Sequence, residues 1–342
     1  MDPVTHALTS LALARAGQRH LPRFGTAIIL TAGLAPDLDY ASYLGGASAF
    51  LRFHRSVLHS LPGAAVVACA SAGVFWWVAR IRDRRPSDPS SPTLRFAPAL
   101  MAAAIGVAAH ILLDVASGTG VQLFWPFRLH RYAWNIIANL DPWVIILLVT
   151  GLLGPVLLRM VGEEIGERRK QPRGRVAAIC VLAIFAAYLG ARAVLHSEAV
   201  DLLLAQEYHG QPPLFADAFP SSTSLLDWRG VVVTDNTVDE ANVLLATGKQ
   251  FDPERSLTHY KPDDSPALEA GQRAAATQTF LNYARFPLAS VAHREDGYRF
   301  ELHDMQFPSG DTSPENMFVR VDLNGGLHIT RQEFLFAASP NP

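Results

Sequence analysis

The sequence predicts a mainly α-helical, polytopic membrane bundle followed by a C-terminal soluble α+β domain with a mostly antiparallel sheet. Hydrophobic residues make up 49% and charged residues only 18% of the 342 residues, against about 25% charged in typical soluble domains. Residues 1–196 carry 19 Lys and Arg and 10 Asp and Glu, a net charge of +9, whereas residues 197–342 carry 10 and 21, a net charge of −11. This asymmetry predicts a membrane domain over 1–196 joined to an acidic extracytoplasmic domain over 197–342.

Two short apolar runs open the chain, Val4–Ala16 and Phe24–Ala35. Both are shorter than the about 20 residues that a spanning helix needs. We predict either a helical hairpin that dips into the bundle or two short tilted helices lengthened by their flanks.

Four longer segments have the length and apolarity of membrane-spanning helices: Leu61–Ile81, Phe96–Ala116, Trp143–Val161 and Val176–Leu195. Arginine-rich loops follow the first and the third of them, which places both loops in the cytoplasm by the positive-inside rule. The segment 117–142 and everything after Leu195 then face outward.

Short alternating runs rich in β-branched or aromatic residues predict strands in the C-terminal domain, at Arg229–Thr234, Ala241–Thr247, Leu288–His293, Tyr298–Phe307, Met317–Leu323 and Leu327–Phe334. Glu295-Asp296-Gly297 and Asn324-Gly325-Gly326 are hairpin-turn signals between some of them. One helix is predicted over Ala267–Tyr283.

His and Asp residues in the apolar half are the candidates for chemistry, because an ionisable group at membrane depth is costly and marks a functional site. With the predicted topology, six of them collect in the outer leaflet. Structural histidines scattered by chance would have no reason to share one depth. We therefore predict a divalent-metal centre held by His6, Asp37, Asp39, His59, His110 and Asp114.

The spacing of these residues supports the metal centre. His110 and Asp114 are four residues apart, so they share one helix face and can bind one ion. Asp37 and Asp39 alternate at a predicted helix end, where both can be ligands or Asp39 can be the general base. Imidazole and carboxylate together suit zinc first, with manganese or iron(II) as alternatives.

Several short motifs occur in a fixed order: Met1-Asp2-Pro3-Val4-Thr5-His6-Ala7, Pro36-Asp37-Leu38-Asp39, His54-Arg55 with His59-Ser60, His110-x-x-x-Asp114, and Gly118…Gly120 followed by Phe124-Trp125-Pro126-Phe127. In this order they resemble the YdjM-type family of membrane-bound, predicted metal-dependent hydrolases over residues 1 to about 195. The family often has Gly-x-Thr before the second His, where this chain has Ser56-Val57-Leu58. More distantly, the order of His and Asp is similar to the helical zinc-dependent phospholipase C and P1 nuclease group, and this likeness implies phosphoesterase chemistry.

Together these observations predict a metal-dependent hydrolase at the outer face of a bacterial inner membrane. Metal-activated water would attack a phosphoester or another lipid-linked substrate. His54 is predicted as a ligand or proton donor and Arg55 as the group that binds the anionic part of the substrate. Further substrate-binding candidates lie among aromatic residues of an outer loop and suit a phosphate headgroup: Arg128, His130 and Arg131.

Two other functions stay open at this stage. A metal-ion transporter would also bury His and Asp, but it needs polar groups at several depths, and the helix middles are almost purely apolar. A membrane anchor without enzymatic activity would present the acidic domain to a protein partner that the sequence does not identify. Without a strongly basic surface, a nucleic-acid partner is not expected.

Overall fold

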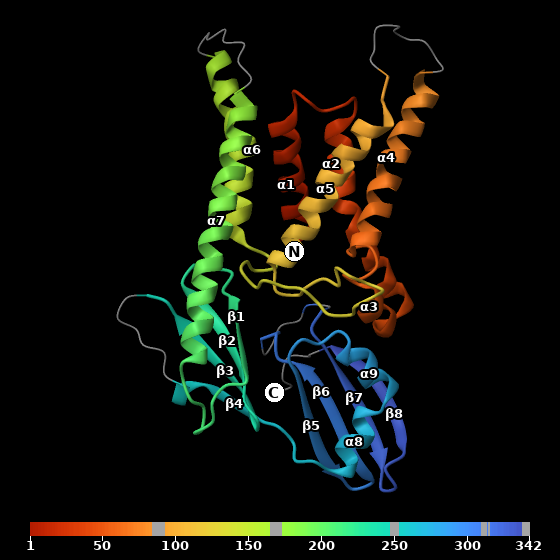
Figure 1. Cartoon of the computed structure of the whole chain (residues 1–342), viewed down its shortest axis with the longest axis vertical. Coiled ribbons are helices and arrows are strands. Elements are labelled where there is room, and N and C mark those ends of the chain that lie inside the picture. The colour runs from red at the N-terminus through yellow and green to blue at the C-terminus, as the bar shows by residue number, and fades with distance from the viewer. Residues whose placement is uncertain (84–92, 165–172, 247–252, 309–312, 314, 337–342) are drawn as a thin grey trace. The chain divides into compact units, whose positions relative to one another are not determined.

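The computed structural model of the chain describes residues 1–83, 93–164, 173–246, 253–308, 313 and 315–336 (Figure 1). The two arginine-rich loops on which the predicted topology depends lie largely outside these residues. The chain forms two compact units. The first comprises Met1–Asp39, Arg55–Arg128 and Tyr132–Val194; the second comprises Tyr40–His54, Leu129–Arg131 and Leu195–Pro342.

The first unit is helical, and the four long helices that the sequence predicts are confirmed. Its helices are α1 (Pro3–Gly17), α2 (Gly25–Leu34), α4 (Leu61–Asp83), α5 (Phe96–Ala116), α6 (Pro142–Glu164) and the larger part of α7 (Arg173–Leu204). In the described part of the chain, α4, α5, α6 and α7 are long and apolar enough to cross a membrane.

The two short helices are present where the apolar runs predict them. Asp2 caps α1, because its carboxylate accepts the N–H of Thr5 at 2.9 Å and Pro3 occupies the first helical position. With 10 residues, α2 is only about 15 Å long. It passes directly into a 3-10 helix, η1 (Ala35–Gly45), which the sequence did not predict.

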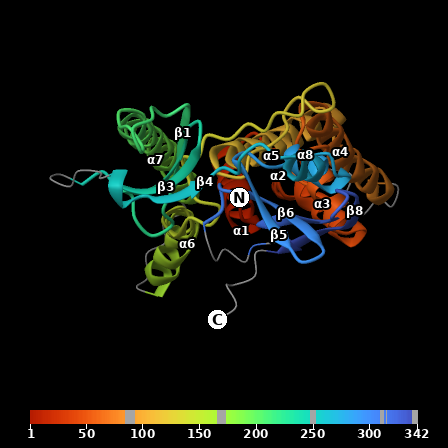
Figure 2. The ribbon, with the colours of Figure 1, turned by 90° about the horizontal axis from the view of Figure 1, so that it is seen from below.

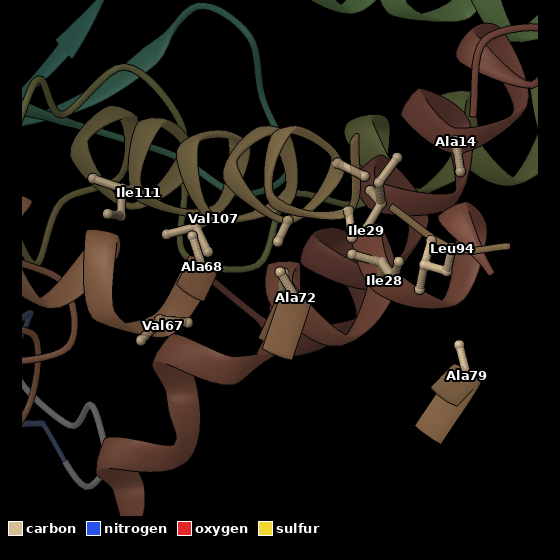
Figure 3. Close-up of a cluster of buried hydrophobic side chains, with 14 of the residues drawn as sticks. Ala14, Ile28, Ile29, Val67, Ala68, Ala72, Ala79, Leu94, Val107 and Ile111 are labelled. Atoms are coloured by element: carbon tan, nitrogen blue, oxygen red, sulfur yellow. The ribbon is translucent and has the colours of Figure 1, made fainter. Parts of the chain in front are cut away.

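Two glycines let α2 approach its neighbours closely within the apolar core, Gly106 at the crossing with α5 and Gly33 at the contact with α1. A Cβ atom on Gly106 of α5 would lie 2.4 Å from the carbonyl oxygen of Ile29, and one on Gly33 of α2 would lie 2.2 Å from Ser10 Oγ. Around this crossing, Ile28 and Val107 belong to a buried cluster shared by α1, α2, α4 and α5 (Figure 3). The close contact brings the backbone of α2 within reach of side chains on α5.

The helix α7 continues nine residues beyond its predicted end and stops at Leu204 rather than Leu195. Its last part belongs to the second unit, where Leu203 is fully buried against Gly230 of a strand. The apolar residues after Leu195 therefore continue the helix because a sheet buries them. Figure 2 shows this helix beside the sheet that contains β1 and β3.

The second unit contains two antiparallel four-stranded sheets. The first sheet has the order β1 (Phe215–Pro220), β2 (Asp227–Val233), β3 (Thr237–Leu244), β4 (Leu257–Tyr260). The second has the order β5 (Pro287–Arg294), β6 (Gly297–Asp304), β7 (Met317–Asn324), β8 (Ile329–Phe336). The predicted mostly antiparallel domain is therefore confirmed, although β1 and β4 were missed.

The single helix predicted over Ala267–Tyr283 is wrong. Two short helices occupy this range, α8 (Pro266–Gln272) and α9 (Ala275–Leu281), and Ala274 between them is extended with φ −60° and ψ 140°. Near the break, Gly271 packs closely on Phe300, since a Cβ there would lie 2.3 Å from the ring of Phe300. The Thr277 hydroxyl donates to the Gly271 carbonyl at 2.8 Å and stabilises the turn.

A segment from the N-terminal half completes the second unit. It contains most of η1 and the helix α3 (Ala47–Phe53), which the sequence did not predict. Phe50 and Leu51 of α3 are buried in one hydrophobic cluster with Phe280 and Phe300. This cluster also includes side chains of β7 and of α8.

Candidate metal centre

Four of the predicted ligands meet in the first unit. His6, Asp37, His110 and Asp114 each turn one ligand atom toward the others, and these atoms all lie within 4.8 Å of one another. They come from the start of α1, from η1 and from the last two turns of α5, which lie at the same end of the helical unit (Figure 1). His6, His110 and Asp114 are buried, whereas Asp37 is partly exposed.

His59 lies beside this group and offers a further candidate ligand atom. It precedes α4 by two residues, and its Nε2 lies 3.0 Å from Asp114 Oδ2 and 3.1 Å from His110 Nε2. Asp37 Oδ1 is 3.9 Å from the same nitrogen. We call His6, Asp37, His59, His110 and Asp114 the His/Asp cluster.

Neighbouring groups fix the orientation of two imidazole rings. His110 Nδ1 lies 2.8 Å from the carbonyl oxygen of Gly33, which can only accept, so Nδ1 carries a proton and Nε2 is the ring nitrogen that faces the cluster. His59 Nδ1 lies 3.0 Å from Asp39 Oδ2. Such outer partners are typical of histidines that bind metals, because they set the tautomer and the direction of the ring.

Asp39 and Arg55 are hydrogen-bonded to each other beside the cluster. The backbone N–H of Arg55 donates to Asp39 Oδ2 at 2.8 Å, and its carbonyl oxygen accepts the N–H of Gln122 at 3.0 Å. Arg55 has φ +55°, a left-handed conformation that costs about 1 kcal/mol for a non-glycine residue. The surrounding hydrogen bonds therefore hold the loop in a conformation that it would not adopt alone.

Positive groups border the buried carboxylate of Asp114. The guanidinium of Arg55 approaches it to 3.8 Å, and the α-amino group of Met1 contacts it directly. Burial lowers the pKa of His59, but hydrogen bonds with Asp114 and Asp39 outweigh this effect and raise its pKa to about 9. A cation bound here would have to displace that proton, as metals do when they bind histidine.

The donor set fits a divalent transition metal. Imidazole nitrogens and carboxylate oxygens in a buried group are the ligands that zinc, manganese and iron(II) share. Among the described residues, His6 Nδ1 and Asp37 Oδ2 are buried and make no hydrogen bond. Buried polar atoms normally have partners, so these two atoms are compatible with a bound cation.

The remaining predicted site residues have other surroundings. His54 and Arg131 belong to the second unit, where both are buried and Arg131 donates to the carbonyl oxygen of His54 at 3.1 Å. Arg128 and His130 are exposed. The roles predicted for these four residues in substrate binding or proton transfer stay predictions.

The family model described as "YdjM inner membrane protein" matches residues 1–199, which is more than half of the chain. The chain belongs to the YdjM inner membrane protein family. The match contains the whole His/Asp cluster of this YdjM protein, and together with the four apolar helices it identifies a membrane protein. No curated protein and no solved structure matches the chain.

Some contributors to the site had no signal in the sequence. Gly33 takes part through its carbonyl oxygen, and every residue has one, so no residue type could reveal it. Gly106 contributes by having no side chain where α2 crosses α5. Asp39 was recognised as a site residue, but its place on the outer side of His59 depends on the fold of the loop.

Proposed function

We propose that this YdjM protein is a metal-dependent hydrolase of the bacterial inner membrane that cleaves a phosphoester or another bond in a lipid-linked substrate. The observation that carries the proposal is the largely buried His/Asp cluster, in which imidazole nitrogens and carboxylate oxygens converge on one another. Zinc is the first choice of ion, with manganese and iron(II) as alternatives.

The cluster residues would hold the ion, whose Lewis acidity makes water a nucleophile near neutral pH. Asp37 is the cluster member with an exposed edge, so it marks the side from which water and substrate would enter. His6, His110 and Asp114 would keep the other sides of the centre dry, because all three are buried.

Asp39 is better suited to positioning than to general base catalysis. The backbone N–H of Arg55 donates to its Oδ2 atom, and His59 Nδ1 lies 3.0 Å from the same oxygen. The carboxylate of Asp39 therefore stabilises the loop at Arg55 and the orientation of the His59 ring. The partly exposed carboxylate of Asp37 is the alternative general base, because it can accept a proton from entering water. This assignment leaves His59 oriented toward the ion and not free to turn.

The position of the cluster supports a lipid-linked substrate. His59 precedes one candidate membrane span, and His110 and Asp114 lie in the last two turns of another. A water-soluble substrate would not need a site at the ends of two spans, whereas a lipid headgroup lies at that depth. Arg128 and the 85%-exposed Phe127 are side by side in the chain and suit contact with an anionic headgroup at the interface.

The orientation of the site completes the proposal. Positive residues after the first and third long helices favour cytoplasmic loops there, so the cluster and the C-terminal domain would face the periplasm. A reporter fused after Pro342 tests this orientation. Activity of a reporter that works only in the periplasm is expected, and activity of one that works only in the cytoplasm would contradict it.

The metal content of the detergent-purified full chain tests the centre. The wild type should retain a divalent ion, and Asp37→Asn and His110→Ala should lose most of it. Wild-type metal content in both variants would contradict the proposed centre. Release of phosphate or headgroup from a lipid panel, with and without a chelator, tests the activity, and release that the chelator does not change would contradict metal-dependent hydrolysis.

A further inference from the structure

The chain between Asp39 and Arg55 belongs to a different unit from its two ends. Asp39 and Arg55 are part of the first unit, beside the His/Asp cluster, whereas Tyr40–His54 belongs to the second unit with the C-terminal sheets. We call Tyr40–His54 the inserted segment. Two peptide bonds, one at each end, connect it covalently to residues that support the cluster.

Apolar side chains anchor the inserted segment in the core of the second unit. Phe50 is fully buried and Leu51 is 3% exposed, and both pack in the cluster that contains Phe280 and Phe300. On the same helix, an Arg52 guanidinium nitrogen lies 3.3 Å from Thr279 Oγ1. The segment is therefore built into this core and is not a surface loop that touches it.

Polar contacts anchor the end of the segment that leads to Arg55. Nε2 of the fully buried His54 lies 3.1 Å from Glu315 Oε1, and the ring of His54 stacks on Phe50. Arg131 donates to the carbonyl oxygen of His54 and lies over the ring of Tyr283, which in turn donates to the carbonyl oxygen of Glu315. These groups fix His54 on both its side chain and its backbone.

The two ends of the segment close on each other beside the cluster. The backbone N–H of Arg55 donates to the carboxylate of Asp39, and the same carboxylate contacts Nδ1 of His59. Arg55 directly follows the segment and has a left-handed backbone conformation. A small shift of the His54 backbone would therefore change the direction in which the chain and the guanidinium of Arg55 extend from the segment. Movement of the inserted segment would therefore displace the partner that orients His59.

We propose that the C-terminal domain positions the metal centre by holding the inserted segment in its own core. Phe50, His54 and Glu315 act as positioning residues in this arrangement, because they belong to the second unit and not to the His/Asp cluster. The inference rests on the proposed metal centre, and it gives the acidic domain a role that the family match, which ends at residue 199, does not cover.

Zinc affinity of the detergent-purified full chain, measured by competition with a chelator, tests the proposal. The variants Phe50→Ala and Glu315→Ala loosen the inserted segment, and Phe50→Leu is the conservative variant. Phe286→Ala is the matched control, since Phe286 is a buried aromatic residue of the same unit that belongs to a different cluster. Circular dichroism at the assay temperature selects the variants that are folded.

We expect Phe50→Ala and Glu315→Ala to weaken zinc binding about tenfold, as the loss of an outer-shell partner does. Phe286→Ala should change it less than twofold, and Phe50→Leu should restore most of the affinity. Wild-type affinity in both segment variants would overturn the proposal, and so would an equal loss in Phe286→Ala. If Phe50→Ala does not fold, Glu315→Ala and Glu315→Gln decide alone. The variant His110→Ala distinguishes failure of the positioning role from failure of the metal centre. Wild-type zinc binding in His110→Ala would contradict the metal centre itself.

Discussion

Both units bury carboxylates, but the partners of these carboxylates differ between the units. In the second unit, Asp304 accepts backbone N–H groups from Arg285, Phe286 and Gln306 at 2.9–3.1 Å. The carboxylate of Asp239 accepts the hydroxyls of Thr237 and Thr258, each at 2.6 Å. In the first unit, the carboxylates and imidazoles of the His/Asp cluster converge on one another.

This difference shows that the partners of a buried carboxylate distinguish a structural carboxylate from a candidate functional one. A buried carboxylate with several donors of its own is satisfied by the fold and stabilises it. A set of buried imidazoles and carboxylates whose ligand atoms converge on one another suits a bound cation instead. Burial by itself would have ranked Asp304 with Asp114, whereas the partners separate them.

The largest expected effect is the loss of metal when a cluster carboxylate is removed. Asp114→Ala should lower metal affinity by about a hundredfold or more, because the carboxylate lies next to three imidazoles of the cluster. Metal analysis of the purified variant measures this. Asp239→Asn in the second unit is the control and should keep its metal; equal loss in both variants would erase the distinction between the two regions.

The second effect is a loss of stability at Asp304. Asp304→Ala removes the acceptor of three backbone N–H groups and should lower the free energy of unfolding of the second unit by about 3 kcal/mol, with metal content unchanged. Thermal unfolding measures it. The partly exposed Asp322 is the control, and Asp322→Ala should cost less than about 1 kcal/mol.

The same variant has an expected pH dependence. Burial raises the pKa of Asp304 above its usual value, although the backbone N–H groups oppose this. A raised folded pKa means that the contribution of Asp304 is complete below the unfolded pKa and declines as the pH rises through the folded pKa. The stability lost in Asp304→Ala should therefore be larger at pH 4 than at pH 7, and a larger loss at pH 7 would contradict the sign.

A smaller effect is expected where α2 crosses α5. The Cβ of Gly106→Ala would meet the carbonyl oxygen of Ile29, so the helices must separate at a cost of about 2 kcal/mol. The separation should also weaken metal binding, because His110 loses the Gly33 carbonyl. Gly73→Ala in α4 is the control, since its Cβ meets nothing within 4 Å and should change stability by less than about 1 kcal/mol. Equal melting temperatures of the two variants would contradict the close-crossing argument.

The smallest effect is expected at Asp39. Asp39→Asn keeps the shape of the side chain but weakens its hold on His59, and metal affinity should fall by about tenfold. Chelator competition measures it. The matched substitution Asp83→Asn, at a partly exposed pair with Arg23, should leave the affinity unchanged. A loss as large as that of Asp114→Ala would show that Asp39 is a ligand.

Periodicity and length were enough to locate most elements. Runs of about 20 apolar residues located α4, α5, α6 and most of α7, because a membrane span depends on local composition. Alternation located β5 to β8 and the turn before Gly297. The strands β1 and β4 were not predicted, because they are short and apolar and polar residues do not alternate clearly along them.

The sequence by itself determined most of the residues that collect in the His/Asp cluster, because they lie near the ends of helices that its apolar runs predict. Only the tertiary structure decided the surroundings of these residues: Asp39 lies beside His59 Nδ1, and the inserted segment, with His54, belongs to the second unit. The physical reason is that burial and hydrogen bonding between distant segments are not encoded in local pattern. Glu315 lies 261 positions from His54, and no spacing rule connects them.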